Sequence, residues 1–358
     1  MNVIDSPIYR ESVLNIARDF DLIKGSVLVT GATGLIGSCI VDVLLAAEKP
    51  DGTEGSLGEN AAERCKIYAL GRNAEKLRKR FSYAADRVNF IVQDIKEPLP
   101  DENFDYIFHC ASNADPRSYA LQPAETVTTN VIGTYNILNY CKSHRETRLL
   151  YTSTFEVYGQ LDKDIYEEAD FGLIDQNQIR SGYPESKRVC EIMLRSYTQE
   201  YGIDALIARL SSIYGPTMLD NDSKAHAQFI RNALKGQDIV LKSEGLQKRT
   251  YCYAADAVRG LFTVLRYGKS GEAYNVANPD SVVSIAQLAR IAAELSGTKV
   301  VFDLPDDIEK KGFSKPQNCV LDTKKLEMLG FKGSYDIRKG MSETMNILKE
   351  AGQRQRSD

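Results

Sequence analysis

The sequence has little net charge and few histidines. Its 45 Lys and Arg residues stand against 49 Asp and Glu residues, which gives a formal charge of −4, and only 3 histidines are present in 358 residues. A protein that binds nucleic acid needs a concentrated positive surface, and this composition gives no reason to expect one. The sequence therefore predicts a small molecule, and not a nucleic acid, as the binding partner.

The sequence also lacks the patterns of a disulfide framework, a metal site or a membrane segment. The seven cysteines form no Cys-x-x-Cys pair and no Cys/His set with ligand spacing, which favours reduced thiols and no bound metal. Residues 1–25 carry acids throughout and no apolar core of a signal peptide, and no later window is long and apolar enough to span a bilayer. We therefore expect a cytoplasmic protein without a membrane partner.

Apolar segments of strand length alternate with segments of helical period over the first part of the chain. This alternation is typical of an α/β fold, and we expect a doubly wound parallel sheet of the Rossmann type over residues 25–210. Residues 1–24 form an N-terminal extension with a short amphipathic helix outside the core, and residues 48–65 read as a surface insertion. Residues 211–358 are expected to build mostly a smaller α+β lobe that binds substrate, with some segments returning to the Rossmann domain.

A glycine-rich turn follows the first predicted strand. The segment VLVTGATGLIGSCI places Gly31, Gly34 and Gly37 between this strand and a helix. Such glycines permit a tight turn, a close approach of the backbone to a pyrophosphate and close packing of helix on sheet. The helix N-terminus then directs unpaired N–H groups at the phosphates. The sequence therefore predicts a bound dinucleotide.

The choice between NAD and NADP stays open at this stage. An acid at the end of the second strand would bind the ribose of NAD, but the sequence places Arg72 there, which can meet the 2′-phosphate of NADP or simply lie in solvent. Asp94 ends the third strand and is either a partner of the adenine amino group or an ordinary turn aspartate. Arg72 thus favours NADP.

A tyrosine and a lysine form the candidate catalytic pair. Tyr183 and Lys187 lie four residues apart at the start of a predicted helix, so both side chains can point from one face. An ammonium group beside a phenol favours the phenolate, which is a general base at neutral pH. The preceding strand adds Thr154, which can hold a substrate oxygen, and Glu156, a possible second base on the same face of an extended segment. The alternative is a plain strand threonine and a solvated glutamate.

Five motifs together resemble the extended short-chain dehydrogenase/reductase family, in its NAD-dependent epimerase/dehydratase group. They are GATGLIG (31–37), HCAS (109–112), TTNVIGT (128–134), STFEVYG (153–159) and YPESK (183–187). Within the group, the motifs R-x-x-Y-x-E-x-K-R and N-D-x-K resemble UDP-glucuronate decarboxylases, and dTDP-glucose 4,6-dehydratases share much of the pattern. The resemblance implies a homodimer that pairs the helices at about 124–143 and 183–200 in a four-helix bundle.

The resemblance also implies roles for individual residues. Tyr183 would remove the proton of a sugar 4-hydroxyl while hydride passes to the nicotinamide, Lys187 would hold the ribose and lower the tyrosine pKa, and Thr154 would orient the sugar. In a dehydratase Glu156 would take the C5 proton, whereas in a decarboxylase the 4-ketone would allow the C5 carboxylate to leave as carbon dioxide. The implied cofactor contacts further include Thr33, Leu35, Ile36, Ile95, Ala111, Ser112 and Asn130, and the implied substrate contacts are Asn113, Ser212, Lys224, Gln228 and Arg249, the last on the diphosphate.

Two positions depart from the family pattern. Phe155 stands where decarboxylases carry a small hydroxyl residue and 4,6-dehydratases an aspartic acid, and a phenyl ring cannot donate a proton. Ser212 replaces an asparagine that binds the sugar diphosphate. A decarboxylase acting on UDP-glucuronate is the leading interpretation, and a 4-epimerase, a 4,6-dehydratase and an NADPH-dependent keto-sugar reductase are alternatives. A cofactor-binding subunit without catalysis is the non-enzymatic alternative.

Overall fold

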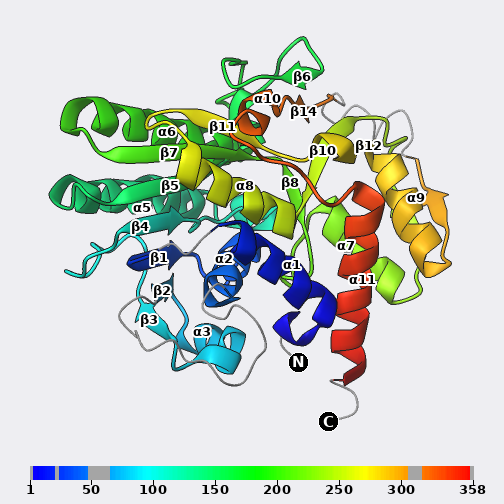
Figure 1. Ribbon diagram of the computed structural model, residues 1–358. Helices are drawn as coiled ribbons and strands as arrows, with labels where there is room; N and C mark the ends of the chain where they lie inside the picture. The colour runs from blue at the N-terminus through cyan, green and yellow to red at the C-terminus, as the bar shows by residue number, and fades with distance from the viewer. Residues whose placement is uncertain (1–2, 21–23, 47–64, 305–316, 355–358) are drawn as a thin grey trace.

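A seven-stranded parallel sheet forms the centre of the protein (Figure 1). The computed structural model describes residues 3–20, 24–46, 65–304 and 317–354. The strand order is β11-β7-β5-β4-β1-β2-β3, and every neighbouring pair is parallel. The strands are β1 (Ser26–Thr30), β2 (Lys66–Gly71), β3 (Val88–Val92), β4 (Tyr106–His109), β5 (Arg148–Thr154), β7 (Asp204–Leu210) and β11 (Ala273–Val276). The predicted α/β class with a doubly wound sheet is confirmed.

The central strands are apolar on both faces because helices cover both faces of the sheet. All five residues of β1 are buried, as are six of the seven residues of β5. The strand order reverses between β1 and β4, and ligands of open α/β sheets bind at the carboxyl ends of the strands at such a point. The turn after β1 and the loop after β4 therefore meet where a ligand is expected.

Two layers of helices enclose the sheet. Helices α5 and α6 share one buried cluster with the sheet, and α1, α2 and α8 share the other, so they lie on opposite faces (Figure 1). The main helices of this region are α1 (Pro7–Asp19), α2 (Leu35–Ala46), α3 (Ala74–Arg80), α4 (Pro116–Leu121), α5 (Pro123–Ser143), α6 (Gly182–Tyr201) and α8 (Ala254–Tyr267). Both α8 and the edge strand β11 come from the C-terminal part of the chain.

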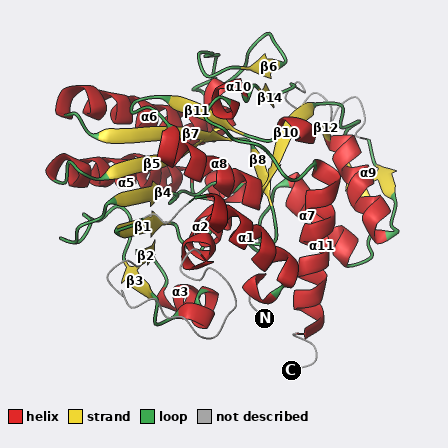
Figure 2. Cartoon of the chain, in the orientation of Figure 1, coloured by secondary structure: helices red, strands yellow, loops and turns green. Residues whose placement is uncertain are grey.

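The remaining C-terminal elements form a lobe beside the sheet (Figure 2). Three short strands pair in the order β12-β10-β8, and two further pairs are β13-β9 and β14-β6. These elements are β6 (Ile165–Tyr166), β8 (Ser212–Tyr214), α7 (Ala225–Leu234), β9 (Ile239–Leu241), β10 (Lys248–Tyr253), β12 (Val282–Ser284), α9 (Ile285–Ser296), β13 (Val300–Phe302), β14 (Val320–Leu321), α10 (Lys324–Glu327) and α11 (Ile337–Arg354). One apolar cluster runs from the sheet into this lobe, so the two parts share a core.

The N-terminal helix is more deeply packed than the sequence suggested. Tyr9, Val13 and Ile16 of α1 are buried in the main core, and the Tyr9 hydroxyl donates a 2.6 Å hydrogen bond to Asp42 of α2. The expectation that this helix packs outside the core is therefore wrong, because its apolar face closes the core over α2. The predicted insertion at 48–65 lies, apart from Cys65, outside the described residues. Among the described helices, none has the length and apolar character that crossing a membrane requires.

Candidate active site

The glycine turn after β1 has the geometry of a phosphate cradle. Gly31 adopts a φ of +65°, and a Cβ atom there would lie 2.8 Å from the carbonyl oxygen of Cys110. A Cβ on Gly37 would collide with the Gly31 carbonyl oxygen, and one on Gly34 would lie 3.3 Å from it. A side chain is therefore excluded at Gly31 and Gly37 and would be tight at Gly34, and α2 begins directly after the turn with its N-terminal N–H groups facing it. The turn, including Thr33 and the first helical residues Leu35 and Ile36, thus fits a dinucleotide pyrophosphate.

Charged side chains gather beside the ends of β2 and β3. Arg72 lies 3.4 Å from Glu125 and 3.9 Å from Asp94, and Lys96 lies 2.9 Å from Glu125. Asp94 also accepts a 2.9 Å hydrogen bond from the backbone N–H of Lys96. This bond fits the interpretation of Asp94 as a turn aspartate. Two carboxylates already face the Arg72 guanidinium, so a 2′-phosphate would have to compete with them. This weakens the argument for NADP.

Lys187 is buried under the carboxyl end of β5. It sits in the first turns of α6, and its exposed fraction is 3%. The Nζ atom donates a 2.9 Å hydrogen bond to the carbonyl of Thr152 and lies 4.6 Å from the centroid of the Tyr151 ring. Burial lowers the pKa of Lys187 to about 8, because it disfavours the charged form. Lys187 therefore titrates close to the physiological range.

Tyr183 is also buried, with an exposed fraction of 6%. Its pKa is raised well above its ordinary value, first by burial and then by the charges of Glu156 and Tyr119, while a hydrogen bond with Thr154 opposes this rise. The expected lowering of this pKa by Lys187 is therefore wrong for this structure. The physical reason is that burial and the Glu156 charge disfavour the phenolate, while the Lys187 ammonium donates its hydrogen bond to the Thr152 carbonyl.

Thr154 and Glu156 stand beside the tyrosine, but not as two residues of one extended strand. Strand β5 ends at Thr154, and a 3₁₀ turn, η4 (Phe155–Tyr158), follows directly. The Thr154 hydroxyl accepts a 3.3 Å hydrogen bond from the backbone N–H of Glu156. The i and i+2 argument is thus wrong here, since the turn sets the direction of Glu156. Its carboxylate lies 3.3 Å from the Arg180 guanidinium. The charge of this carboxylate is the second-largest cause, behind burial, of the raised pKa of Tyr183.

Asn130 ties the cofactor side to the catalytic helix. Its carboxamide oxygen accepts a 2.8 Å hydrogen bond from Ser112, in the loop after β4, and its amide donates a 2.9 Å bond to Ser186 of α6. Ser186 in turn donates a 2.7 Å bond to the carbonyl of Tyr183. Asn130 is almost fully buried, so this chain of bonds fixes α6 against the sheet edge. Ala111, next to Ser112, donates its N–H to Thr30 at the end of β1.

The predicted substrate residues divide into two groups. Lys224 and Gln228 lie at the start of α7 and bond locally, Lys224 to Asp222 at 3.4 Å and Gln228 to the Ser223 carbonyl at 2.5 Å. Ser212 lies on β8, which pairs with β10, the strand that carries Arg249. Among these predicted substrate residues, two have a buried nitrogen without a hydrogen-bond partner in the described part of the chain: Asn113, at Nδ2, and Arg249, at Nε. Such buried unsatisfied donors are uncommon and suit a polar ligand.

Three residues that the sequence reasoning missed complete the site. The Tyr119 ring stacks on the Tyr183 ring, with centroids 4.9 Å apart and an interplanar angle of 18°. The Arg180 guanidinium lies 5.9 Å from the Tyr119 ring centroid. Ser186 lies inside the YPESK motif, so the motif could have identified it as a site residue. Tyr119 lies in no such motif, and its spacing does not distinguish it from the other tyrosines. Tyr119 covers a face of the candidate base, so a sugar must displace it or bind along its edge.

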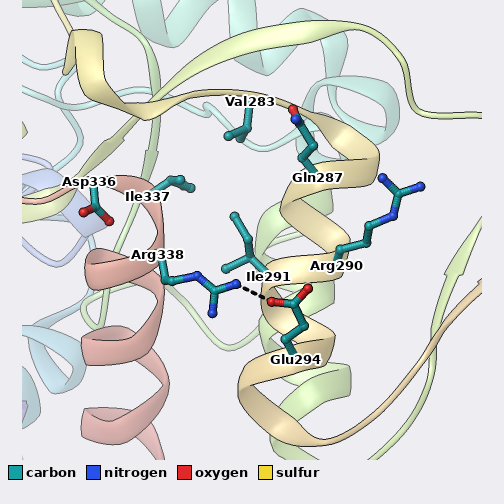
Figure 3. A pocket seen from close by; sticks show the side chains of 8 residues that line it. All are labelled: Val283, Gln287, Arg290, Ile291, Glu294, Asp336, Ile337 and Arg338. Atoms are coloured by element: carbon teal, nitrogen blue, oxygen red, sulfur yellow. Dashed lines mark hydrogen bonds and ion pairs between the residues drawn. The ribbon is translucent and has the colours of Figure 1, made fainter.

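A separate hollow is lined by residues of the C-terminal lobe and not by the candidate site residues. Its volume is about 460 Å³, and it lies between α9 and α11, where Arg338 pairs with Glu294 (Figure 3). None of the predicted catalytic, cofactor or substrate residues lines it. The site described above is thus a cluster of closely packed side chains at the sheet edge and is distinct from this hollow.

Comparison with known proteins supports the interpretation of the motifs. The family described as "NAD dependent epimerase/dehydratase family" matches residues 27–277. UDP-glucuronic acid decarboxylase 6 of Arabidopsis thaliana is 34% identical over 319 residues, which cover 88% of this chain and 86% of that protein. The decarboxylase 1 of Xenopus tropicalis is 30% identical, over 95% of this chain and 79% of that protein.

A solved structure agrees with these relatives. The dTDP-glucose 4,6-dehydratase DesIV from Streptomyces venezuelae, crystallised with NAD, superposes with a TM-score of 0.74 and 26% identity over 91% of this chain and 97% of the other. The predicted resemblance is confirmed by the match to most of the chain. The protein belongs to the NAD dependent epimerase/dehydratase family.

Proposed function

We propose that this protein is an NAD-dependent nucleotide-sugar enzyme whose reaction is the decarboxylation of UDP-glucuronate. The observation that carries the proposal is the gathering of Tyr183, Thr154 and Glu156 at the carboxyl end of β5. In this parallel sheet, the carboxyl end of β5 lies on the same side as that of β1, where the glycine turn begins. The UDP-glucuronic acid decarboxylases of Arabidopsis thaliana and Xenopus tropicalis, at 34% and 30% identity, support the choice of sugar.

The residues divide the proton chemistry among them. When bound, the dinucleotide accepts a hydride from the sugar and later returns it. Tyr183 takes the proton of the 4-hydroxyl, and the Thr154 hydroxyl orients that oxygen. The C5 carboxylate of the 4-keto sugar is that of a β-keto acid, so its bond to C5 breaks with release of carbon dioxide, and the electron pair passes into the 4-keto group as an enolate. C5 then takes up a proton from water, which restores the 4-ketone before the hydride returns. The phenol formed in the first step then returns its proton to O4 when the hydride comes back to C4.

We propose NAD as the cofactor. Gly31, Gly34 and Gly37 would hold the pyrophosphate, Asn130 and Ser112 would fix the wall beside it, and Lys187 would bind the ribose. Arg72 faces two carboxylates within 4 Å, which leaves it a poor partner for a 2′-phosphate. The dehydratase DesIV, in the same family fold, was crystallised with NAD.

A 4-epimerase is the second candidate, and Phe155 favours it. Epimerisation needs the tyrosine, the threonine and rotation of the keto sugar, but no side-chain donor at position 155. The UDP-glucuronic acid 4-epimerase of Bacillus cereus has the same fold, with a TM-score of 0.72 at 22% identity. A 4,6-dehydratase would need an acid where this chain has Phe155. Because a phenyl ring cannot donate a proton, this residue disfavours 4,6-dehydration.

One incubation separates these reactions. The protein is mixed with UDP-glucuronate and NAD, and products are followed by chromatography, mass spectrometry and carbon dioxide release. Formation of a UDP-pentose with one carbon dioxide per sugar is the expected result. UDP-galacturonate without carbon dioxide would replace the decarboxylase by the epimerase, and the absence of both products from folded, cofactor-loaded protein would refute the proposed substrate.

We also propose a homodimer in the cytoplasm. Helices α5 and α6 pack against each other and expose apolar side chains that a solvated helix face does not need, among them Ile132, Tyr135, Val189 and Ile192. Pairing with a second copy would remove this surface from water. The cytoplasmic location rests on free cysteine thiols, such as that of the buried Cys141. Free thiols are typical of a reducing compartment.

A further inference from the structure

Phe155 is the residue that neither family pattern explains, and the structure places a cation on it. The residue opens η4 and is partly buried against a small apolar cluster that includes Tyr158 and Leu321. The guanidinium carbon of Arg249 lies 5.6 Å from the centroid of its ring. This distance is within the range of a cation–π interaction. Phe155 thus contacts the lobe that carries the substrate residues.

The backbone of Arg249 is held in a strand, but its guanidinium has no ion-pair partner among the described residues. Its backbone lies on β10, opposite Val283 of β12 on one side and bridged to Cys319 on the other. Among the described residues, no carboxylate lies within 4.0 Å of its guanidinium, and its buried Nε atom has no hydrogen-bond partner. The ring of Phe155 is therefore the contact that orients the guanidinium, which still has unused donors.

The position of this charge connects it with the catalytic tyrosine. Burial raises the pKa of Tyr119, Glu156 adds to the rise, and the cations Arg180 and Arg249 oppose it. Tyr119 is the residue stacked on Tyr183. Arg249 therefore lies close enough to the catalytic residues for its charge to act on Tyr119, the ring stacked on Tyr183.

We propose that Phe155 is a positioning residue whose ring holds the guanidinium of Arg249 for the diphosphate of the nucleotide sugar. This inference rests on the proposed function, because it needs a substrate with a diphosphate. A ring face attracts a guanidinium without using its N–H groups, so these stay free to bind two phosphate oxygens at once. A hydroxyl at position 155 has no ring face to offer, and a carboxylate would neutralise the cation. Compared with the family pattern, Phe155 thus removes a polar side chain beside the sugar and, in exchange, orients the cation of Arg249.

The test measures the binding of UDP by titration calorimetry. UDP carries the diphosphate without the sugar, so its affinity does not depend on which reaction follows. Phe155→Leu keeps an apolar side chain but removes the ring, and we expect it to weaken UDP binding by about three- to tenfold, the range of a partly shielded cation–π contact. Phe155→Tyr keeps the ring face and should bind UDP as the wild type does. Phe155→Met takes the place of the leucine variant if the latter does not fold.

A double-mutant cycle separates positioning from general packing. In an Arg249→Gln background, Phe155→Leu should cost no further affinity, because the cation that the ring orients is gone. In the steady state, Phe155→Leu should raise KM for the sugar nucleotide with little change in kcat. Additive losses in the double variant, or an unchanged affinity of Phe155→Leu, would overturn the inference and leave the proposed function standing. A wild-type protein that binds no UDP would overturn both.

Discussion

Replacing Lys187 by methionine should change how the stability of the protein depends on pH. The lysine is almost fully buried, and its ammonium group contacts the Thr152 carbonyl and the Tyr151 ring. Its pKa falls from the ordinary value of 10.5 to about 8 on folding, and burial is the largest cause. Methionine has a similar length and no charge to desolvate. The variant should therefore lose the dependence that Lys187 imposes, together with the ribose contact proposed for it.

The sign and size follow from the two pKa values. Between pH 8 and 10.5 the unfolded chain holds a proton at this lysine that the folded chain has lost, so the stability contributed by Lys187 rises with pH across that window. At roughly 1.4 kcal/mol per pKa unit, the full change is about 3 kcal/mol. Between pH 7 and pH 9 the wild type should gain about 1 kcal/mol of unfolding free energy relative to the variant.

The assay is urea denaturation of both proteins at pH 7 and pH 9, followed by fluorescence or circular dichroism. Comparing the two proteins removes the contribution of every other titrating group. Lys142→Met is the matched control, because Lys142 also lies over a tyrosine ring, at 4.0 Å from the centroid in Tyr201, but is exposed. Its stability difference from the wild type should be the same at both pH values. A difference for Lys187→Met that stays constant, or moves in the opposite direction, would refute the reasoning.

Four further changes test the site and the assembly. Tyr183→Phe should lower kcat by about 10²- to 10⁴-fold, and retention of activity within a few-fold would remove the tyrosine as acid and base. Asn130→Ala breaks two buried hydrogen bonds and should lower the unfolding free energy by about 1–3 kcal/mol in a urea titration; a neutral result would contradict the proposed link between loop and helix. Ile192→Glu should shift a dimer to monomer in light scattering, unless the helix face is not the interface. Arg72→Ala should leave the preference for NAD over NADP unchanged in calorimetry, whereas a selective loss of NADP binding would restore its phosphate role.

The helices and strands were largely readable from the sequence. Continuous apolar runs such as SVLVT predict strands buried on both faces, and the glycine spacing predicts the turn that follows. Helices α5 and α6 lie within one or two residues of the predicted ranges. These features depend on neighbours in the chain, so a local pattern is enough to find them. The N-terminal helix was also found, but its burial was not, because that depends on α2, α8 and α11 packing around it.

The site shows the same division. The identity of Tyr183, Thr154 and Glu156 as candidates came from motifs, since their spacing is a local property. The direction of the tyrosine pKa did not, because burial, its largest cause, is a property of the packed structure. The stacking of Tyr119 on Tyr183 and the cation–π contact of Arg249 with Phe155 join residues 64 and 94 positions apart, and no local pattern predicts such pairs. The sequence by itself determined which chemistry the residues can perform, and tertiary structure decided which charges and rings meet at the sheet edge, because only folding brings distant segments together and removes them from water.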